Sequence, residues 1–447
     1  MSAPFGPFTL TLDDITRKMR ETFETFIDPR TGKNKMYTMV DAALSAFSVF
    51  FTQSPSFLDY QRGQEQTHGE NNARTLFGAH EVPSDNQIRN LLDETPPSAA
   101  TPIFSYIFNA LEQSGVVDAQ RSLGGSLLLA IDGTEYFSSS TIHCQNCSTR
   151  EHANGEVTYS HTALVPVLVK PGSNKVIPLA PEFVQPQDGA VKQDCELNAA
   201  KRWLAAHGKE FAQRNTIILG DDLYCHEPFC RDLQSLGLNF ILVCKPNSHP
   251  TTYEWIEDLE RNGAVHTVSH KRWTGKRHEI DTYRYIEAIP LRDADDALLV
   301  NWCEITTTTE DDKVLYHNTF VTQCTINTGN VAEIVDAGRS RWKIENENNN
   351  VLKNNGYHFE HNYGHGQKYL SSLLATLIIL SFLTHTVLEW MDDKYRLLRQ
   401  KLPSRKRLFN DIQTLTRYLC FESWEALMNF MLNSFDAPSS PLKLDTG

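Results

Sequence analysis

Five short apolar runs between residues 127 and 243 constrain the fold of this chain more than any other feature. They cover residues 127–131, 163–169, 176–179, 216–219 and 240–243, each bounded by polar residues, Gly or Pro. Runs of this length are typical of buried strands. Residues 195–206 and 228–236 have helical spacing and lie between the last three runs, so the sequence predicts a mixed α/β sheet.

The regions on either side of this core follow other patterns. Residues 1–125 have mainly helical spacing, which returns near residue 331 and continues through an apolar run at 369–388 to residues 424–432. Residues 250–328 hold strand-like runs with no obvious helix among them. We expect a helical N-terminal region at 1–125, core segments at 126–249 and 329–390, a β-rich insertion at 250–328 and a helical tail at 391–447.

A polar segment at residues 84–92 predicts a capped helix in the N-terminal region. Ser84 or Asp85 is a suitable N-cap, and Ile88, Leu91 and Leu92 fall on one helical face. Such a helix suits the second helix of a small unit that binds DNA ends, and it suits equally well a helix packed on a core. The sequence leaves both interpretations open.

Net charge bears on the class of partner. The 447-residue chain has a formal net charge of −13, which disfavours nucleic acid because phosphates are bound mainly by Lys and Arg. Residues 394–407, however, contain seven Lys and Arg side chains and no acidic one. A basic patch in the C-terminal tail is therefore compatible with DNA binding.

Cysteine usage and hydropathy bear on location. Nine cysteines at irregular spacing, with no pattern of a secretory signal, predict a cytoplasmic protein with reduced thiols. The apolar run at 369–388 approaches the length of a membrane span, but Ser, Thr and His residues interrupt it. We expect a buried core helix here and no membrane partner.

Two aspartates stand where predicted strands end. Asp132 follows the run at 127–131, and Asp221 follows Gly220 and the run at 216–219. Ligands of open α/β sheets bind outside the carboxyl ends of strands, so both carboxylates are candidates for a site. Either aspartate could instead cap the turn that follows it.

Three short segments that contain acidic residues follow one another along the chain. They are Asp132-Gly133-Thr134, Asp221-Asp222-Leu223-Tyr224 and Arg341-Trp342-Lys343-Ile344-Glu345. Together they resemble the three catalytic motifs of DDE transposases of bacterial insertion sequences. The resemblance spans residues 127–390 and implies a ribonuclease-H-like mixed sheet with flanking helices, a β-rich insertion before the catalytic Glu and a helical N-terminal region.

By this resemblance, Asp132, Asp221 and Glu345 are the catalytic residues and hold two Mg²⁺ ions, for which Mn²⁺ can substitute. Two such ions activate the nucleophile and stabilise the leaving oxygen of a phosphodiester. The implied activity is cleavage of transposon ends and strand transfer. The implied partners are double-stranded DNA, as terminal inverted repeats and target DNA, and a second copy of the chain, because two ends must meet.

Each acidic candidate has a rival nearby. Asp222 competes with Asp221, which the strand-end position and the spacing to Tyr224 favour. Glu347 competes with Glu345, but residues two apart on a helix do not share a face, and the preceding Arg-Trp favours Glu345. The same core could also belong to a metal-dependent nuclease without strand transfer or to a domesticated, non-catalytic DNA-binding protein.

The resemblance also implies DNA contacts around the third motif. Arg341 is expected to bind a phosphate near the scissile bond, with Arg339 and Lys353 as further contacts. The family pattern has Tyr and Lys where this chain has Gly338 and Leu352, and Lys353 lies one residue late.

Aromatic side chains near the third motif have two interpretations. Trp342, Tyr357, Phe359 and Tyr363 could stack on unpaired bases, or they could pack in the core, as most aromatic residues do.

Cysteine and histidine residues cluster after the first motif. Cys144 and Cys147, with His152 and His161 downstream, are compatible with a tetrahedral structural Zn²⁺. The spacing is not that of a standard zinc finger, and ordinary buried thiols are the alternative. Cys225, His226 and Cys230 lie beside Asp221 and could complete a site, but cysteine is often simply a small buried apolar residue.

Overall fold

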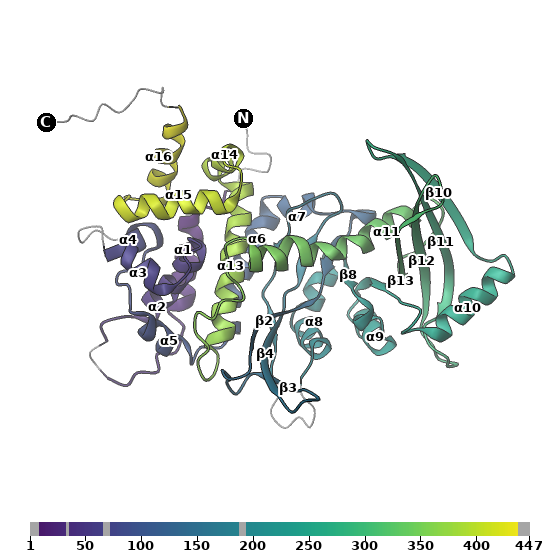
Figure 1. Ribbon diagram of the computed structural model, residues 1–447, viewed down its shortest axis with the longest axis horizontal. Helices are drawn as coiled ribbons and strands as arrows, with labels where there is room; N and C mark the ends of the chain where they lie inside the picture. Colours follow the sequence, from purple (N-terminus) through teal and green to yellow (C-terminus); the bar gives the residue numbers. More distant parts are fainter. Residues whose placement is uncertain (1–8, 33–34, 66–71, 187–193, 437–447) are drawn as a thin grey trace. The chain divides into compact units, whose positions relative to one another are not determined.

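The computed structural model describes residues 9–32, 35–65, 72–186 and 194–436 (Figure 1). The chain divides into two compact units. The helical unit comprises Met1–Val116, Ile142–Gln145 and Val351–Gly447. The sheet unit comprises Val117–Thr141 and Asn146–Asn350.

The helical unit is built almost entirely of helices, as the periodicity of its residues predicts. Its helices are α1 (Leu12–Phe23), α2 (Met39–Phe51), α3 (Phe57–Glu65), α4 (Asn72–Phe77), α5 (Asp85–Leu92), η1 (Pro97–Ala100), α6 (Thr101–Gln113), α12 (Asn350–Asn354), α13 (Leu370–Met391), α14 (Asp393–Lys401), α15 (Arg405–Tyr418) and α16 (Trp424–Asp436). Thr11 and Thr38 begin α1 and α2 with capping boxes, each accepting a hydrogen bond from an aspartate N–H three residues on.

Helix α13 is the core of the helical unit. It is long and apolar enough to cross a membrane, yet it is buried in the protein along the whole of its most apolar stretch. Its neighbours include α2, α5 and α14. A helix that is apolar all round and covered by protein is typical of a protein core, so the expectation of a buried core helix is confirmed.

Helix α5 begins as predicted. The Ser84 hydroxyl accepts a hydrogen bond from the N–H of Gln87, and Ile88, Leu91 and Leu92 are buried. This apolar face is therefore used in packing.

The sheet unit holds all the strands of the described residues. Its elements are α7 (Val116–Ala119), η2 (Leu123–Gly125), β1 (Leu127–Ala130), β2 (Gly133–Ser139), β3 (Ser148–Glu151), β4 (Val157–Leu164), β5 (Val167–Val169), β6 (Ile177–Pro178), β7 (Glu182–Val184), α8 (Glu196–Gln213), β8 (Thr216–Gly220), η3 (Asp222–Tyr224), α9 (Glu227–Ser235), β9 (Asn239–Val243), α10 (Pro250–Arg261), β10 (His266–Trp273), β11 (His278–Pro290), β12 (Leu299–Thr309), β13 (Val314–Thr322), α11 (Val331–Arg339), η4 (Ser340–Trp342) and η5 (Ile344–Asn349).

Among the described residues, these strands form a mixed nine-stranded sheet and a smaller one. The order of the large sheet is β10-β11-β12-β13-β9-β8-β1-β5-β6. Strands β1, β8 and β9 are parallel, and the other pairs are antiparallel. Helix α8 contacts β8, and α9 and α11 contact β9. The predicted mixed α/β architecture with flanking helices is therefore confirmed.

The two central strands show why the apolar runs form this core. Every residue of β1 and of β8 is buried. A continuous apolar run is what a parallel strand covered on both faces requires. Their burial fixes the carboxyl edge of the sheet, where the polar residues that follow each strand emerge.

The apolar run at 163–169 is two strands, not one. Strand β4 ends at Leu164 in the smaller sheet, and β5 begins at Val167 in the large sheet. Pro166 lies between them and has no N–H to continue a ladder. The smaller sheet also contains β2 and β3, which were not predicted because their residues are mostly polar and only Thr134 and Tyr136 among them are buried.

The prediction that residues 250–328 contain no helix is wrong at the start of that segment. Helix α10 begins with Pro250, and its buried side chains Thr252 and Ile256 are four residues apart, too few to give a clear apolar pattern. The four long strands that follow are not a separate sheet, because β13 pairs with β9 and extends the large sheet.

Candidate active site

Asp132 and Asp221 lie side by side at the carboxyl edge of the large sheet. In the parallel pair β1 and β8, Ala130 is aligned with Leu219, and the N–H of Ile131 donates to the carbonyl of Leu219. Each aspartate is two residues beyond this aligned pair, so the two backbones are about one strand spacing apart, roughly 4.8 Å. The predicted proximity of the two carboxylates follows from the register.

Arg341 comes to the same edge from a segment far along the chain. Its Nη1 lies 3.3 Å from Asp132 Oδ2, and both side chains are largely buried. Its 3-10 turn, η4, contacts β8, and the following η5 contacts β5, on the two sides of β1. The segment therefore crosses β1 and sets the guanidinium against Asp132. The alternative that Arg341 and Glu345 merely form an exposed ion pair is not seen in the described residues.

The segment that carries the third motif is not a regular α-helix. After the 3-10 turn η4, residues Ile344–Asn349 form a π-helix. Short π-helical stretches are uncommon and occur frequently at functional sites. Arg341 and Glu345 lie four residues apart on either side of this change, and their surroundings differ: the Arg341 side chain is largely buried, whereas Glu345 is exposed.

Glu196, at the start of α8, is a further carboxylate of the site that sequence reasoning missed. Its Oε2 occupies the space that a Cβ on Gly133 would need. Its Oε1 accepts a hydrogen bond of 2.5 Å from the hydroxyl of the fully buried Tyr224. An acidic residue in the first turn of a helix is common for dipole reasons alone, so the sequence carries no specific signal for it.

The electrostatics of Asp132 reflect these neighbours. Burial raises the pKa of Asp132 to about 7, the carboxylates of Glu196 and Asp221 act in the same direction, and the Arg341 guanidinium opposes them. Three carboxylates and one guanidinium leave the edge with excess negative charge. Hard oxygen donors held in this way suit a divalent cation such as Mg²⁺.

The hydrogen bonds of Asp221 and Asp222 show which of the two is the better candidate for a metal ligand. Both oxygens of Asp222 are engaged: Oδ1 accepts from the N–H of Lys245 at 2.7 Å, and Oδ2 accepts from the hydroxyl of Ser248 at 2.5 Å. Asp221 accepts one hydrogen bond through Oδ1, from the N–H of Leu223. Asp221 thus caps η3, as the structural alternative predicted, and keeps its other oxygen for a ligand.

Glu345 does not join the cluster of acidic side chains formed by Asp132, Asp221 and Glu196. In the described part of the chain it forms no hydrogen bond or ion pair with Asp132 or Asp221, and these three residues do not gather their oxygens within 4.8 Å. A site for two ions does not require such closeness, because two ions about 3.5–4 Å apart can each take different ligands. Glu347 is half-buried on the same π-helix.

The predicted DNA contacts have different surroundings. The Arg339 guanidinium lies 4.4 Å from the centre of the Tyr316 ring. Trp342 is 46% exposed, whereas Tyr357, Phe359 and Tyr363 are buried. In the helical unit, Lys353 pairs with Glu360 at 2.9 Å. Core packing is therefore the role of the three buried aromatic residues, and Trp342 alone among the four offers its ring to solvent.

The basic segment at 394–407 is largely neutralised within the helical unit. Arg405 and Arg399 both pair with Glu389, and further ion pairs join Lys394 to Glu425, Arg396 to Asp393 and Arg407 to Asp411. Paired cations release fewer counterions from DNA than free ones. The stretch is therefore less basic than its composition suggests.

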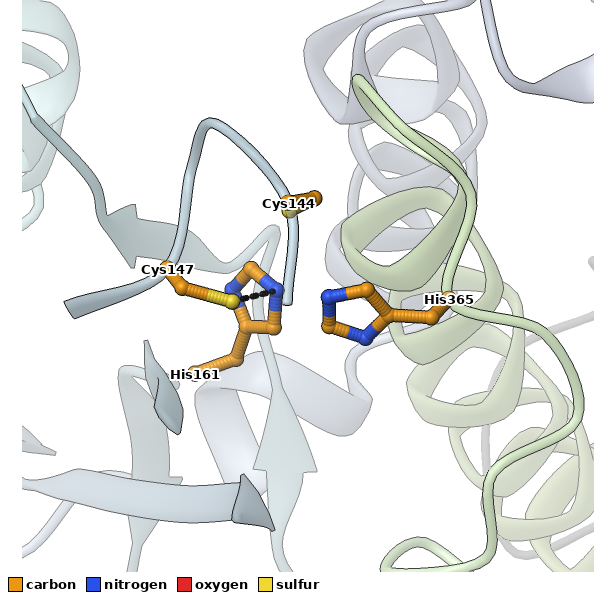
Figure 2. A group of neighbouring side chains, drawn as sticks. All are labelled: Cys144, Cys147, His161 and His365. Carbon is orange, nitrogen blue, oxygen red and sulfur yellow. Dashed lines mark hydrogen bonds between the residues drawn. The ribbon is translucent and has the colours of Figure 1, made fainter. Parts of the chain in front are cut away.

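The cysteine and histidine candidates fall into separate groups. In the sheet unit, Cys147 Sγ lies 3.4 Å from His161 Nε2, as predicted for neighbouring ligands (Figure 2). His152 is not part of this arrangement, because its Nε2 is 2.8 Å from the Thr158 hydroxyl and its side chain belongs to no described metal-ligand group. A second group of Cys225, Cys244 and His249 is buried beside Asp222.

No protein-family model matches this chain, and no curated protein matches it. The candidate site accordingly rests on its own geometry: two aspartates at adjacent strand ends, Glu196 above Gly133, and Arg341 paired with Asp132.

Proposed function

We propose that this chain is a DDE-type DNA transposase that cleaves and joins transposon ends by two-metal phosphodiester chemistry. The observation that carries the proposal is the alignment of Asp132 and Asp221 on adjacent parallel strands, with Arg341 from the third motif bound to Asp132. Three segments spread over more than 200 residues thus contribute to one edge of the sheet, in the order of the motifs they resemble.

The fold around this edge supports a ribonuclease-H-like core. Strands β1, β5, β6, β8 and β9 form a mixed five-stranded part of the large sheet. Asp132 follows the first of these strands and Asp221 the fourth. Four antiparallel strands then intervene before the helical segment that bears Glu345, which is where the resembled family carries its β-rich insertion.

The donor set fits divalent metal ions. Asp132, Asp221 and Glu345 would hold the ions, and Glu196 is close enough to Asp132 to take part through its own carboxylate or a bound water. Two Mg²⁺ ions, when bound, activate the attacking oxygen and stabilise the leaving oxygen of the phosphodiester. Burial of Asp132 excludes water from one side of the site and strengthens its attraction for cations.

The other residues orient the substrate. In this structure the Arg341 Nη1 lies 3.3 Å from Asp132 Oδ2 and offsets the charge of that carboxylate. The planar guanidinium is suited to bind a DNA phosphate beside the aspartates. The Tyr224 hydroxyl fixes the Glu196 carboxylate, and Asp222 fixes the turn after β8 through Lys245 and Ser248. Double-stranded DNA is the proposed partner, bound by a dimer because two ends must be joined.

The test is Mg²⁺-dependent cleavage of a labelled duplex that carries the DNA flanking the coding sequence of this chain. We expect Asp132→Asn, Asp221→Asn and Glu345→Gln each to reduce cleavage at least about 100-fold while a gel-shift assay shows retained DNA binding. The neighbouring variant Glu347→Gln is the matched control and should keep cleaving, and Asp222→Asn, which keeps an acceptor oxygen for the Lys245 N–H, should lower cleavage far less than Asp221→Asn.

The products separate this proposal from its alternatives. Joining of the cut end to a target plasmid supports a transposase, cleavage without joining supports a nuclease, and binding without cleavage supports a DNA-binding protein. Undiminished cleavage by Asp132→Asn would contradict the assignment of this edge of the sheet as the catalytic site.

A further inference from the structure

Two cysteines and one histidine converge beyond the carboxyl ends of β8 and β9, within the sheet unit. The ligand atoms of Cys225, Cys244 and His249 all lie within 4.8 Å of one another, and the three residues are buried. Cys225 and Cys244 are fully covered, and His249 is 7% exposed. Thiols and an imidazole gathered this closely are the donors that zinc binds in proteins.

Backbone hydrogen bonds hold both cysteines. Cys244 directly follows β9, and its N–H donates to the carbonyl of Thr319 at 3.1 Å. Its carbonyl accepts from the hydroxyls of Tyr253 at 2.7 Å and Thr319 at 2.5 Å. Cys225 directly follows η3, and its N–H donates to the carbonyl of Asp222 at 3.2 Å. Both thiols therefore come from segments whose positions the sheet fixes.

Asp222 positions His249 through the turn that joins β9 to α10. Its carboxylate accepts hydrogen bonds from the Lys245 N–H and the Ser248 hydroxyl. Its Oδ1 lies 3.6 Å from His249 Nε2, which is too long for a hydrogen bond, and this nitrogen is buried and forms no hydrogen bond with the described residues. A carboxylate beside one ring nitrogen is the usual outer partner of a histidine whose other nitrogen binds a metal ion.

Two further candidates from the same stretch of sequence lie outside this group. His226 is exposed, and its ring centre is 6.0 Å from that of His249. Cys230 is buried on α9, but its side chain belongs to no described metal-ligand group. Cys244 is brought to Cys225 instead, because β8 and β9 are parallel neighbours and end at the same edge of the sheet. No local sequence spacing points to this pairing.

We propose that Cys225, Cys244 and His249 bind one Zn²⁺ ion. Three protein donors fill three positions of a tetrahedral shell, and a water fills the fourth. The ion joins the turn after β8 to the end of β9 and the start of α10, and so braces the segment next to Asp221. Its sulfur donors distinguish this site from the carboxylates of Asp132 and Asp221, which suit Mg²⁺. The inference does not rest on the proposed function, and its tests need no DNA.

The first experiment measures the zinc content of the full chain, purified in reducing buffer without chelator, by mass spectrometry of the metal. We expect Cys225→Ser and His249→Gln each to contain one zinc per chain less than the wild type. Cys303→Ser, at a buried cysteine of β12, is the matched control and should keep the wild-type content. Zinc bound elsewhere on the chain cancels in this difference. A wild type without zinc, or an unchanged zinc content in His249→Gln, would overturn the proposal.

A second experiment keeps all three ligands and so does not depend on whether the ligand variants fold. Cys147 lies 3.4 Å from His161 and could bind cobalt itself, so it is first replaced by serine together with Cys144. This double variant is depleted of metal and titrated with Co²⁺ alone. Bands of tetrahedral cobalt with thiolate charge transfer, saturating at one equivalent and displaced by zinc, are expected. Spectra of octahedral cobalt, or no spectral change, would contradict the proposed site.

Discussion

Gly133 lies against the carboxylate of Glu196, so the residue after Asp132 has no room for a Cβ. Glu196 cannot swing away freely, because the buried Tyr224 hydroxyl donates to its Oε1. The glycine of the first motif is therefore explained by packing: it lets a carboxylate from α8 come next to Asp132. This contact gives the first prediction.

Gly133→Ala should destabilise the protein by about 1–3 kcal/mol, the usual effect of overpacking a filled space. Urea unfolding measures the change. Gly32→Ala is the matched control, because nothing lies within 4 Å of a Cβ built there. In the double variant Gly133→Ala with Glu196→Ala most of the loss should be recovered, whereas additive losses would show that the two residues are not coupled.

Asp132→Asn should stabilise the protein in EDTA. A folded-state pKa of about 7, against 3.8 in the unfolded chain, means that the native carboxyl binds its proton more tightly. Its contribution to stability is therefore complete below pH 3.8 and is lost as the pH rises through 7. Asn has no proton to lose, so the gain in unfolding free energy should grow between pH 3.8 and pH 7, stay well below its maximum at pH 5 and reach about 1–3 kcal/mol at pH 8.

Thermal unfolding of Asp132→Asn and of the wild type at pH 5 and pH 8 gives this comparison directly. Other titrating groups are shared by both proteins and cancel in the difference. A difference that is the same at both pH values would show that the negative charge of Asp132 is not the cause.

His385 should make the protein sensitive to mild acid. It is fully buried on α13, its Nδ1 is 2.5 Å from the Tyr357 hydroxyl, and burial and the nearby Arg405 hold its pKa well below 6.5. Below about pH 6.5 the unfolded chain takes up a proton that the folded chain refuses, so stability is lost as the pH falls.

The loss attributable to His385 should approach about 1.4 kcal/mol per pH unit below that point. Urea unfolding from pH 7.5 to 5.5 should show a shallower pH dependence in His385→Phe, which cannot titrate, although its stability at pH 7.5 is lower. His278→Gln, at an exposed position, should keep the wild-type dependence. An unchanged slope in His385→Phe would contradict the assignment.

Trp342→Ala should weaken DNA binding without changing stability, if the proposed function holds. The ring is 46% exposed and follows Arg341, which faces Asp132. Loss of one stacked base corresponds to about 1–3 kcal/mol, or roughly 5- to 150-fold in affinity for single-stranded or distorted DNA. Trp255→Ala on α10, at 49% exposure, is the matched control. Fluorescence anisotropy measures both, and equal affinities would remove Trp342 from the interface.

Part of the candidate site could be predicted from local sequence because it depends on strand ends. Apolar runs end at Ile131 and Gly220, and the polar residue that follows a buried parallel strand must emerge at the sheet edge. Glu196 could not be found in this way, because its role arises from contact with Gly133 and Tyr224, and α8 carries no motif.

The sequence by itself determined the mixed α/β core, the helical N-terminal region, the capped helix at Ser84 and the buried character of α13, because each depends on short-range periodicity and burial. Only the tertiary structure decided that the run at 163–169 belongs to two sheets, that the 3-10 turn before the π-helix sets Arg341 on Asp132, and that β10–β13 extend the core sheet. Strand partners and charge neighbours are non-local, and their choice depends on which surfaces the whole chain can bury together.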